Sequence, residues 1–93
     1  MIVSFGKKTT EKIWQGERVK NIPLEIQKIG RRKLRMLNNS QNITDLKIPP
    51  SNRLEKLKGD KKDFYSIRIN NQWRIIFKWA NNHSFDVEIT DYH

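Results

Sequence analysis

Residues 65–90, YSIRINNQWRIIFKWANNHSFDVEIT, contain the pattern that decides the fold. Apolar and polar side chains alternate along this stretch, which is typical of strands with one buried face. Two segments rich in asparagine, residues 70–72 and 81–83, interrupt the alternation and predict turns. The stretch therefore predicts three consecutive strands that pair as an antiparallel meander.

The alternation also predicts which side chains point toward the core. The inward set is apolar and comprises Tyr65, Ile67, Ile69, Trp73, Ile75, Phe77, Trp79, Phe85, Val87 and Ile89. The outward set is mostly polar and comprises Ser66, Arg68, Asn70, Arg74, Ile76, Lys78, Asp86, Glu88 and Thr90. Three of these outward residues are cations on rigid strands, and Arg53 and Lys58 of the preceding loop can approach them. The outer face of the sheet is therefore a candidate site for an anionic ligand.

The residues before the meander predict helices that pack on its inward face. Residues 2–5 form a short apolar run and predict an N-terminal strand, and residues 7–15 predict a short helix that ends at Gly16. Pro23 and Glu25 are first-turn signals of a longer helix, whose apolar residues run at helical spacing to Leu37. We therefore expect an α+β fold with an N-terminal strand, two helices and a mostly antiparallel sheet.

Two further features of this region are a row of basic residues on the longer helix and a polar connector after it. The outward positions of the longer helix form a basic stripe, which fits a solvated helix face and a contact surface equally well and comprises Lys28, Arg31, Arg32, Lys33 and Arg35. Residues 38–63 are polar and contain Pro49 and Pro50, so they predict a connector with at most one helical turn, near residues 44–47.

Composition limits the class of protein. The 93 residues predict a single domain over residues 1–93, and 19 basic against 10 acidic side chains give a net charge of +9. A charge of that size favours a polyanionic partner such as nucleic acid, with an acidic protein or an anionic membrane as alternatives. No apolar run is long enough to span a membrane and no signal-peptide pattern opens the chain, so we expect a cytoplasmic protein. The chain has no cysteine and only two histidines, which favours a mechanism without a metal or cofactor.

The last three residues, Asp91, Tyr92 and His93, bring an acid, a phenol and an imidazole to the chain end. Terminal residues of most domains are poorly ordered and tolerate change. Composition and position alone therefore favour a frayed terminus over a catalytic one for His93.

Three motifs favour a catalytic role for the last residues, because together they resemble the motifs of HigB-type toxins of the RelE superfamily. These are residues 52–60 (NRLEKLKGD), residues 65–77 and residues 87–93 (VEITDYH), and the opening residues 1–5 also fit. The resemblance covers the whole chain and implies a compact RelE-like fold of the microbial-ribonuclease type. It further implies the toxin of a type II toxin-antitoxin system, a metal-independent endoribonuclease that cleaves messenger RNA in the ribosomal A site.

The reaction that the resemblance implies is attack of a ribose 2′-hydroxyl on the adjacent phosphorus. It needs a base, an acid and cations that stabilise the charge on phosphorus. The expected catalytic residues are Arg74, His93, Tyr92, Asp91 and Lys58, and the expected RNA-binding or phosphate-binding residues are Arg53, Arg68 and Lys78. Arg74 suits phosphate because its guanidinium is a planar fork, and His93 suits proton transfer because imidazole titrates near neutral pH. Glu55 stands where some relatives carry a histidine, which leaves the acid and base assignments open.

The resemblance also implies partners. These are a cognate helix-turn-helix antitoxin of the HigA type, the ribosome with messenger RNA in its A site, and operator DNA only through the antitoxin. The antitoxin could cover either the basic stripe or the active face. The alternative function is a non-catalytic basic module, or an inactive toxin relative, that binds nucleic acid or the antitoxin. Such a module would need the charge of the chain but not its last three residues.

Overall fold

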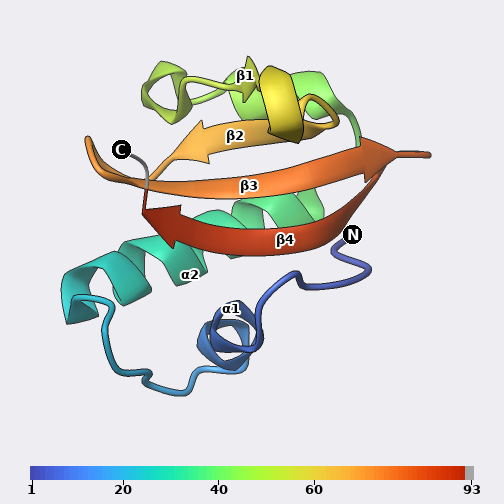
Figure 1. Cartoon of the computed structure of the whole chain (residues 1–93). Coiled ribbons are helices and arrows are strands. Elements are labelled where there is room, and N and C mark those ends of the chain that lie inside the picture. The colour runs from blue at the N-terminus through green and yellow to red at the C-terminus, as the bar shows by residue number, and fades with distance from the viewer. Residues whose placement is uncertain (92–93) are drawn as a thin grey trace.

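The computed structural model describes residues 1–91, in which two helices lie against one face of a four-stranded antiparallel sheet (Figure 1). The helices are α1, Lys8–Trp14, and α2, Leu24–Asn39, and the single-turn 3₁₀ helices are η1, Ile43–Lys47, η2, Pro50–Asn52, and η3, Gly59–Lys61. The strands pair in chain order and are β1, Glu55–Lys56, β2, Phe64–Arg68, β3, Trp73–Ala80, and β4, His83–Asp91. The α+β fold and the antiparallel meander predicted from the sequence are confirmed.

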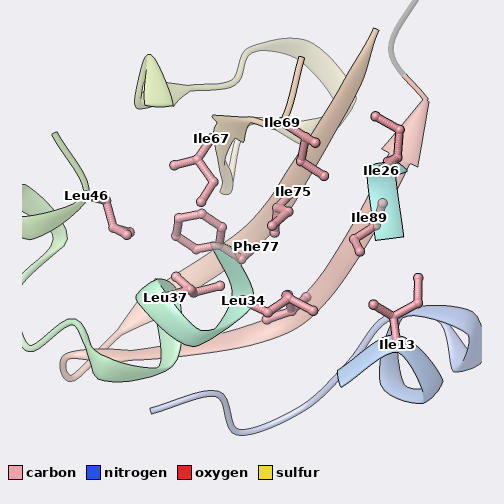
Figure 2. Close-up of a cluster of buried hydrophobic side chains, with 11 residues drawn as sticks. Ile13, Ile26, Leu34, Leu37, Leu46, Ile67, Ile69, Ile75, Phe77 and Ile89 are labelled. Atoms are coloured by element: carbon pink, nitrogen blue, oxygen red, sulfur yellow. The ribbon is translucent and has the colours of Figure 1, made fainter. Parts of the chain in front are cut away.

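α2 packs closely on the sheet because Gly30 faces it. A Cβ atom at Gly30 would lie 3.0 Å from Ile89 Cδ1 and 3.4 Å from Ile69 Cδ1, so a larger side chain would push the helix outward. The core between helices and sheet is fully apolar (Figure 2) and comprises Ile13, Ile26, Leu34, Leu37, Leu46, Ile67, Ile69, Ile75, Phe77, Val87 and Ile89. No helix within residues 1–91 is both long and apolar enough to cross a membrane.

The N-terminal segment runs parallel to β4 and covers its outer edge. The predicted strand at residues 2–5 is reduced to two isolated bridges, Ile2 with Ser84 and Phe5 with Val87. Further along the same edge, Thr10 Oγ1 of α1 accepts a 2.9 Å hydrogen bond from the Ile89 amide. These contacts pair the polar backbone groups that an edge strand otherwise exposes to other chains.

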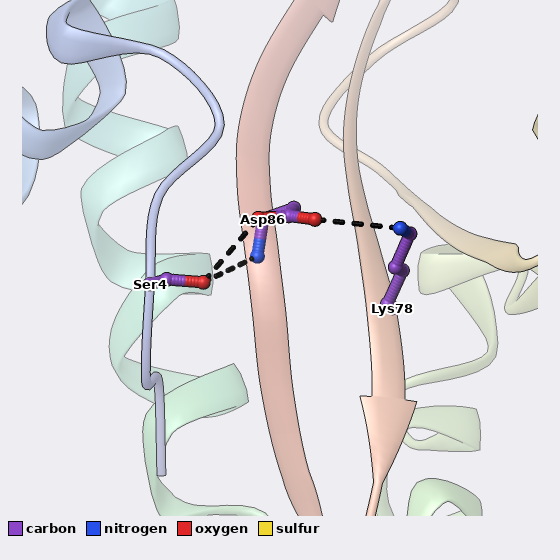
Figure 3. Close-up of polar contacts among 3 residues, drawn as sticks. All are labelled: Ser4, Lys78 and Asp86. Carbon is purple, nitrogen blue, oxygen red and sulfur yellow. Dashed lines mark hydrogen bonds and ion pairs between the residues drawn. The ribbon is translucent and has the colours of Figure 1, made fainter.

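A β-bulge in β4 interrupts the parallel and the antiparallel ladders at the same place. Ile76 pairs with Glu88 but Lys78 pairs with Phe85, so Phe77 faces two residues of β4 instead of one. Asp86, inside the bulge, has a left-handed backbone with φ of 52°. Its amide donates to Ser4 Oγ at 2.9 Å and its carboxylate lies 3.5 Å from Lys78 Nζ (Figure 3).

The bulge corrects the prediction for Phe85. Simple alternation puts Phe85 on the inward face with Val87, but Phe85 pairs with Lys78 and so lies on the outer face. The extra residue at the bulge changes the phase of β4, and Ser84 is the fully buried residue instead. Alternation in the sequence could not locate the bulge, because a prediction from alternation assumes that each strand is regular throughout.

The connector is more ordered than its polar composition indicates. It contains β1, a fourth strand that the sequence analysis missed, and three 3₁₀ helices. Asn52, at the end of η2, is fully buried, and its Oδ1 accepts a hydrogen bond from Lys33 Nζ of α2. Lys33 is only 5 % exposed, so the prediction that it belongs to the outward basic stripe is wrong. The reason is tertiary, since the connector folds back over α2 and covers it.

Burial of Lys33 predicts a dependence of stability on pH. Desolvation, with a smaller contribution from Arg32, lowers the pKa of Lys33 from 10.5, because removal from water penalises the charged amine. Between that lowered pKa and 10.5 the unfolded chain binds more protons than the native one. The free energy of unfolding therefore rises with pH in this range. We expect the free energy of unfolding of the wild type, relative to Lys33→Met, to rise as the pH approaches 10.5.

Urea unfolding at a series of pH values measures this difference. Lys28→Met removes an exposed lysine from the same helix and corrects for the loss of one charge. If the free energy of unfolding of the wild type, relative to Lys33→Met, stays constant or falls with rising pH, the assignment is wrong.

Candidate active site

The face of the sheet away from the helices carries two of the predicted cations in direct register. Arg68 of β2 pairs with Arg74 of β3, which in turn pairs with Thr90 of β4. Side chains paired across antiparallel strands leave the sheet on the same side, with Cβ atoms about 5 Å apart. The side chains of the two arginines and of Thr90 therefore start from one row of the outer face.

Arg74 is anchored at the turn between β2 and β3. Its Nη1 donates to the carbonyl oxygens of Asn70 and Trp73, the latter at 3.3 Å. The side chain is half-buried, so its position on the strand is fixed by its own turn. These contacts direct the guanidinium toward the turn that precedes it.

Arg68 is half-buried and contains the one buried side-chain nitrogen within residues 1–91 that makes no hydrogen bond, its Nε. A buried donor without a partner costs about 1–3 kcal/mol. Arg68 is also the register partner of a second arginine, Arg74. The buried Nε is an unfavourable feature of Arg68 within the part of the chain that the structure describes.

Arg53 enters the sheet near the same row. It follows η2 in a left-handed conformation with φ of 45°, and its side chain is exposed. Two residues later Glu55 pairs with Ser66, and Arg68 lies two residues beyond Ser66 on β2. Arg53 therefore precedes β1 at the end of the strand nearer Arg68, while Glu55 occupies the next row.

Lys58 and Lys78 lie toward the other end of this face. Lys58 is exposed and lines a hollow of about 330 Å³ with Glu55, Lys56, Leu57 and Lys61. Lys78 pairs with Phe64, four residues along β2 from Arg68, which is about 13 Å at the usual rise of a strand. Its amine lies 5.3 Å from the centroid of the Phe64 ring. The structure thus separates the predicted cations into two groups at opposite ends of one face.

Asp91 is the last described residue of the predicted tail, and Tyr92 and His93 lie outside the described residues. Asp91 pairs with Trp73, one residue before Arg74, and its Oδ1 accepts a 3.1 Å hydrogen bond from Gln72 Nε2. Two polar residues at this end, Gln72 and the register partner Thr90, were not among the predicted site residues. Alternation predicted Thr90 to point outward, but only the bulge in β4 puts it opposite Arg74.

Residues 1–91 contain no group of three or more histidine, cysteine, aspartate or glutamate side chains that could hold a metal ion. The outer face instead offers guanidinium and ammonium groups. These can bind an anion and stabilise negative charge that develops on it.

Comparison with known proteins identifies relatives of the chain. Residues 3–93 match the family of RelE-like toxins of the type II toxin-antitoxin system HigB. The chain is 40 % identical to Toxin HigB-1 of Vibrio cholerae over 82 aligned residues. The aligned segment covers 87 % of this chain and 86 % of the relative. It is 28 % identical over 94 residues to Endoribonuclease HigB of Proteus vulgaris, with both chains fully covered.

Solved structures share the fold. The chain resembles a chain in the YoeB-YefM complex from Staphylococcus aureus with a TM-score of 0.61 and 20 % identity, over 100 % of this chain and 98 % of that one. A second structure, a heterotetrameric YoeB-YefM toxin-antitoxin complex from the same organism, matches with the same TM-score and 19 % identity. The sheet, its cationic outer face and the sequence match over residues 3–93 together identify the chain as a member of the HigB-like toxin family, the RelE-like toxins of type II toxin-antitoxin systems.

Proposed function

We propose that this toxin is a ribosome-dependent endoribonuclease that cleaves messenger RNA without a metal ion. The observation that carries the proposal is the register pair of Arg68 and Arg74 on the outer face of the sheet. The relative named as an endoribonuclease matches along the full chain, which supports the same class of reaction here.

The physical argument is that Arg68 has a buried nitrogen that makes no hydrogen bond and leaves the sheet beside a second arginine, Arg74. A phosphate on this row would accept charge-assisted hydrogen bonds from planar guanidinium forks. Groups arranged before the reaction stabilise charge at little cost when it develops.

In the proposed reaction the ribose 2′-oxygen forms a bond to the adjacent phosphorus, and the bond from phosphorus to the 5′-oxygen of the next nucleotide breaks. One group takes the 2′-proton and another gives a proton to the 5′-oxygen. His93 is our candidate for proton transfer, with Tyr92 and Asp91 in supporting roles and Arg74 on the reacting phosphate. Lys58, Arg53, Arg68 and Lys78 would hold the RNA backbone or share its charge.

The proposed partners follow from the family and the charge. Membership of the HigB-like family and structural neighbours in toxin-antitoxin complexes support an antitoxin partner, and we propose that it is a HigA-like helix-turn-helix protein. Contact with operator DNA would occur only through that antitoxin. Action on messages in the ribosomal A site would place the toxin in the cytoplasm.

The arginine pair predicts opposite effects on stability and activity. Replacement Arg68→Thr removes the buried nitrogen that makes no hydrogen bond, so we expect it to raise the free energy of unfolding by about 1 kcal/mol while it weakens growth inhibition. Urea unfolding and a growth assay measure the two effects. Lys20→Thr, which removes one exposed charge from a loop, is the matched control. A variant that is less stable than the wild type and equally toxic would show that Arg68 is a structural residue.

The proposed chemistry predicts the ends of the products. Because the 2′-oxygen is the nucleophile, we expect a 2′,3′-cyclic phosphate or its hydrolysed form on one fragment and a 5′-hydroxyl on the other. A message with a 2′-deoxy nucleotide at the cleaved position should stay intact on programmed ribosomes, while the matching all-ribose message is cut. Cleavage of the deoxy message would exclude this mechanism. No cleavage of either message would favour the non-catalytic basic module.

The position of the proposed catalytic residues at the chain end predicts a difference between tags. A tag fused directly after His93 adds bulk beside the proposed catalytic residues, so we expect it to lower the cleavage rate more than an N-terminal tag. The N-terminus lies along β4, where Met1 O accepts a 3.0 Å hydrogen bond from the Ser84 amide. Cleavage rates of the two tagged proteins on the same message provide the measurement. Equal rates would speak against a catalytic tail.

A further inference from the structure

A buried polar network joins α2 to the connector just before Arg53. Lys33 Nζ donates to Asn52 Oδ1, and Asn52 Nδ2 donates to the carbonyl oxygens of Leu46 at 3.1 Å and Ile48 at 3.4 Å. Asn52 is fully buried, and Lys33 is nearly so. The network therefore ties a rigid helix to the backbone of two turns of the connector, η1 and η2.

The next residue in the chain is Arg53, and the contacts on both sides of it restrict its direction. Asn52 precedes it in the interior, and Leu54 follows it, half-buried and packed against the core. Arg53 itself is exposed and its amide donates to Pro50 O at 3.0 Å, which closes the turn of η2. A residue between two inward anchors must present its side chain to the outside.

η2 also lies against β2, the strand that carries Arg68. The left-handed backbone of Arg53, with φ of 45°, costs about 1–2 kcal/mol for a residue other than glycine. Such a conformation persists only where the surrounding structure determines it. The contacts next to it are the Arg53 amide bond to Pro50 O and the buried anchor at Asn52.

We propose that Lys33 is a positioning residue for RNA binding, which acts through Asn52 to hold the Arg53 guanidinium at the level of Arg68. The inference rests on the proposed function, because it takes the outer face to be the RNA-binding surface. It assigns a role to a buried lysine on the opposite side of the connector from that surface, where it cannot touch RNA.

Packing between α2 and the connector does not by itself explain a lysine at position 33. Burial of an amine with one neutral acceptor is less favourable than burial of a methionine or leucine of similar size. A long donor from α2 does provide one thing that an apolar side chain lacks, a directed bond to Asn52 that leaves its amide group free to bind two backbone carbonyls. Positional control of the turn accounts for the lysine, whereas packing alone does not.

The test is a double-mutant cycle on the salt dependence of RNA binding. The probe is a single-stranded RNA oligonucleotide with 2′-deoxy sugars at the reactive positions, and anisotropy gives its dissociation constant over a range of salt concentrations. Loss of one phosphate contact lowers the slope of log affinity against log salt by about 0.7 for single strands. We expect Arg53→Ala to lower the slope by about this amount in the wild-type background and to have no effect in the Lys33→Met background.

Arg74→Ala is the reference within the same cycle, and it should lower the slope equally in both backgrounds. Lys28→Met, which removes an exposed lysine from α2, is the matched control, and in that background Arg53→Ala should keep its full effect. A lysine with a purely structural role would weaken the Arg53 and Arg74 contributions together. If Lys33→Met does not fold, Lys33→Gln, whose amide is too short to keep the same bond, replaces it in the cycle.

Three outcomes would overturn the inference. An equal effect of Arg53→Ala in both backgrounds would show that Lys33 does not position Arg53. An effect of Arg74→Ala but none of Arg53→Ala in the wild type would show that Arg53 is no RNA contact, and the proposed function would stand. No effect of either substitution would overturn the RNA-binding surface itself, and the inference with it.

Discussion

The β-bulge at Asp86 is the constraint on which the arrangement of the site depends. From the tight turn, Ala80 pairs with His83 and Lys78 with Phe85, and the same register continued would put Ile89 opposite Arg74. The extra residue shifts the register by one, so Ile89 pairs with Ile75 in the core and Thr90 takes the place opposite Arg74. A one-residue slip exchanges the two faces of a strand, so removal of the bulge would move the apolar end of β4 to the solvent side. Ser4 and Lys78 hold the bulge from both neighbouring segments (Figure 3).

The two faces of the sheet have opposite energetic roles. The inner face packs the helices against a continuous apolar core, which supplies the stability of a small chain. The outer face holds Arg68 and Arg74 in register, with the Arg68 Nε buried and without a hydrogen bond. The sheet fixes the backbone of both arginines, so the anion that we propose for this row would meet residues that are already in place.

Irregular backbone is held in place by side chains in this fold. Thr10, Ser4 and Asn52 each bond to backbone groups at points where no regular ladder continues. The connector, although polar and broken by two prolines, is thereby fixed between α2 and β2. The loop that carries Arg53 therefore starts from a buried anchor, and the cations that it contributes belong to the same rigid unit as the sheet.

The sequence by itself determined the class of fold, the two helices, the three long strands and the outward direction of Arg68, Arg74 and Lys78, because these follow from local periodicity and turn residues. It also determined the family, through motifs that cover the whole chain. Only the tertiary structure decided that Lys33 is buried, that Phe85 lies outside the core and that the connector forms a fourth strand. It alone separated the cations into two groups and set Thr90 beside Arg74. The physical reason is that these features depend on contacts between residues far apart in the chain, and one added residue in a strand, invisible to local periodicity, changes the partner of every residue beyond it.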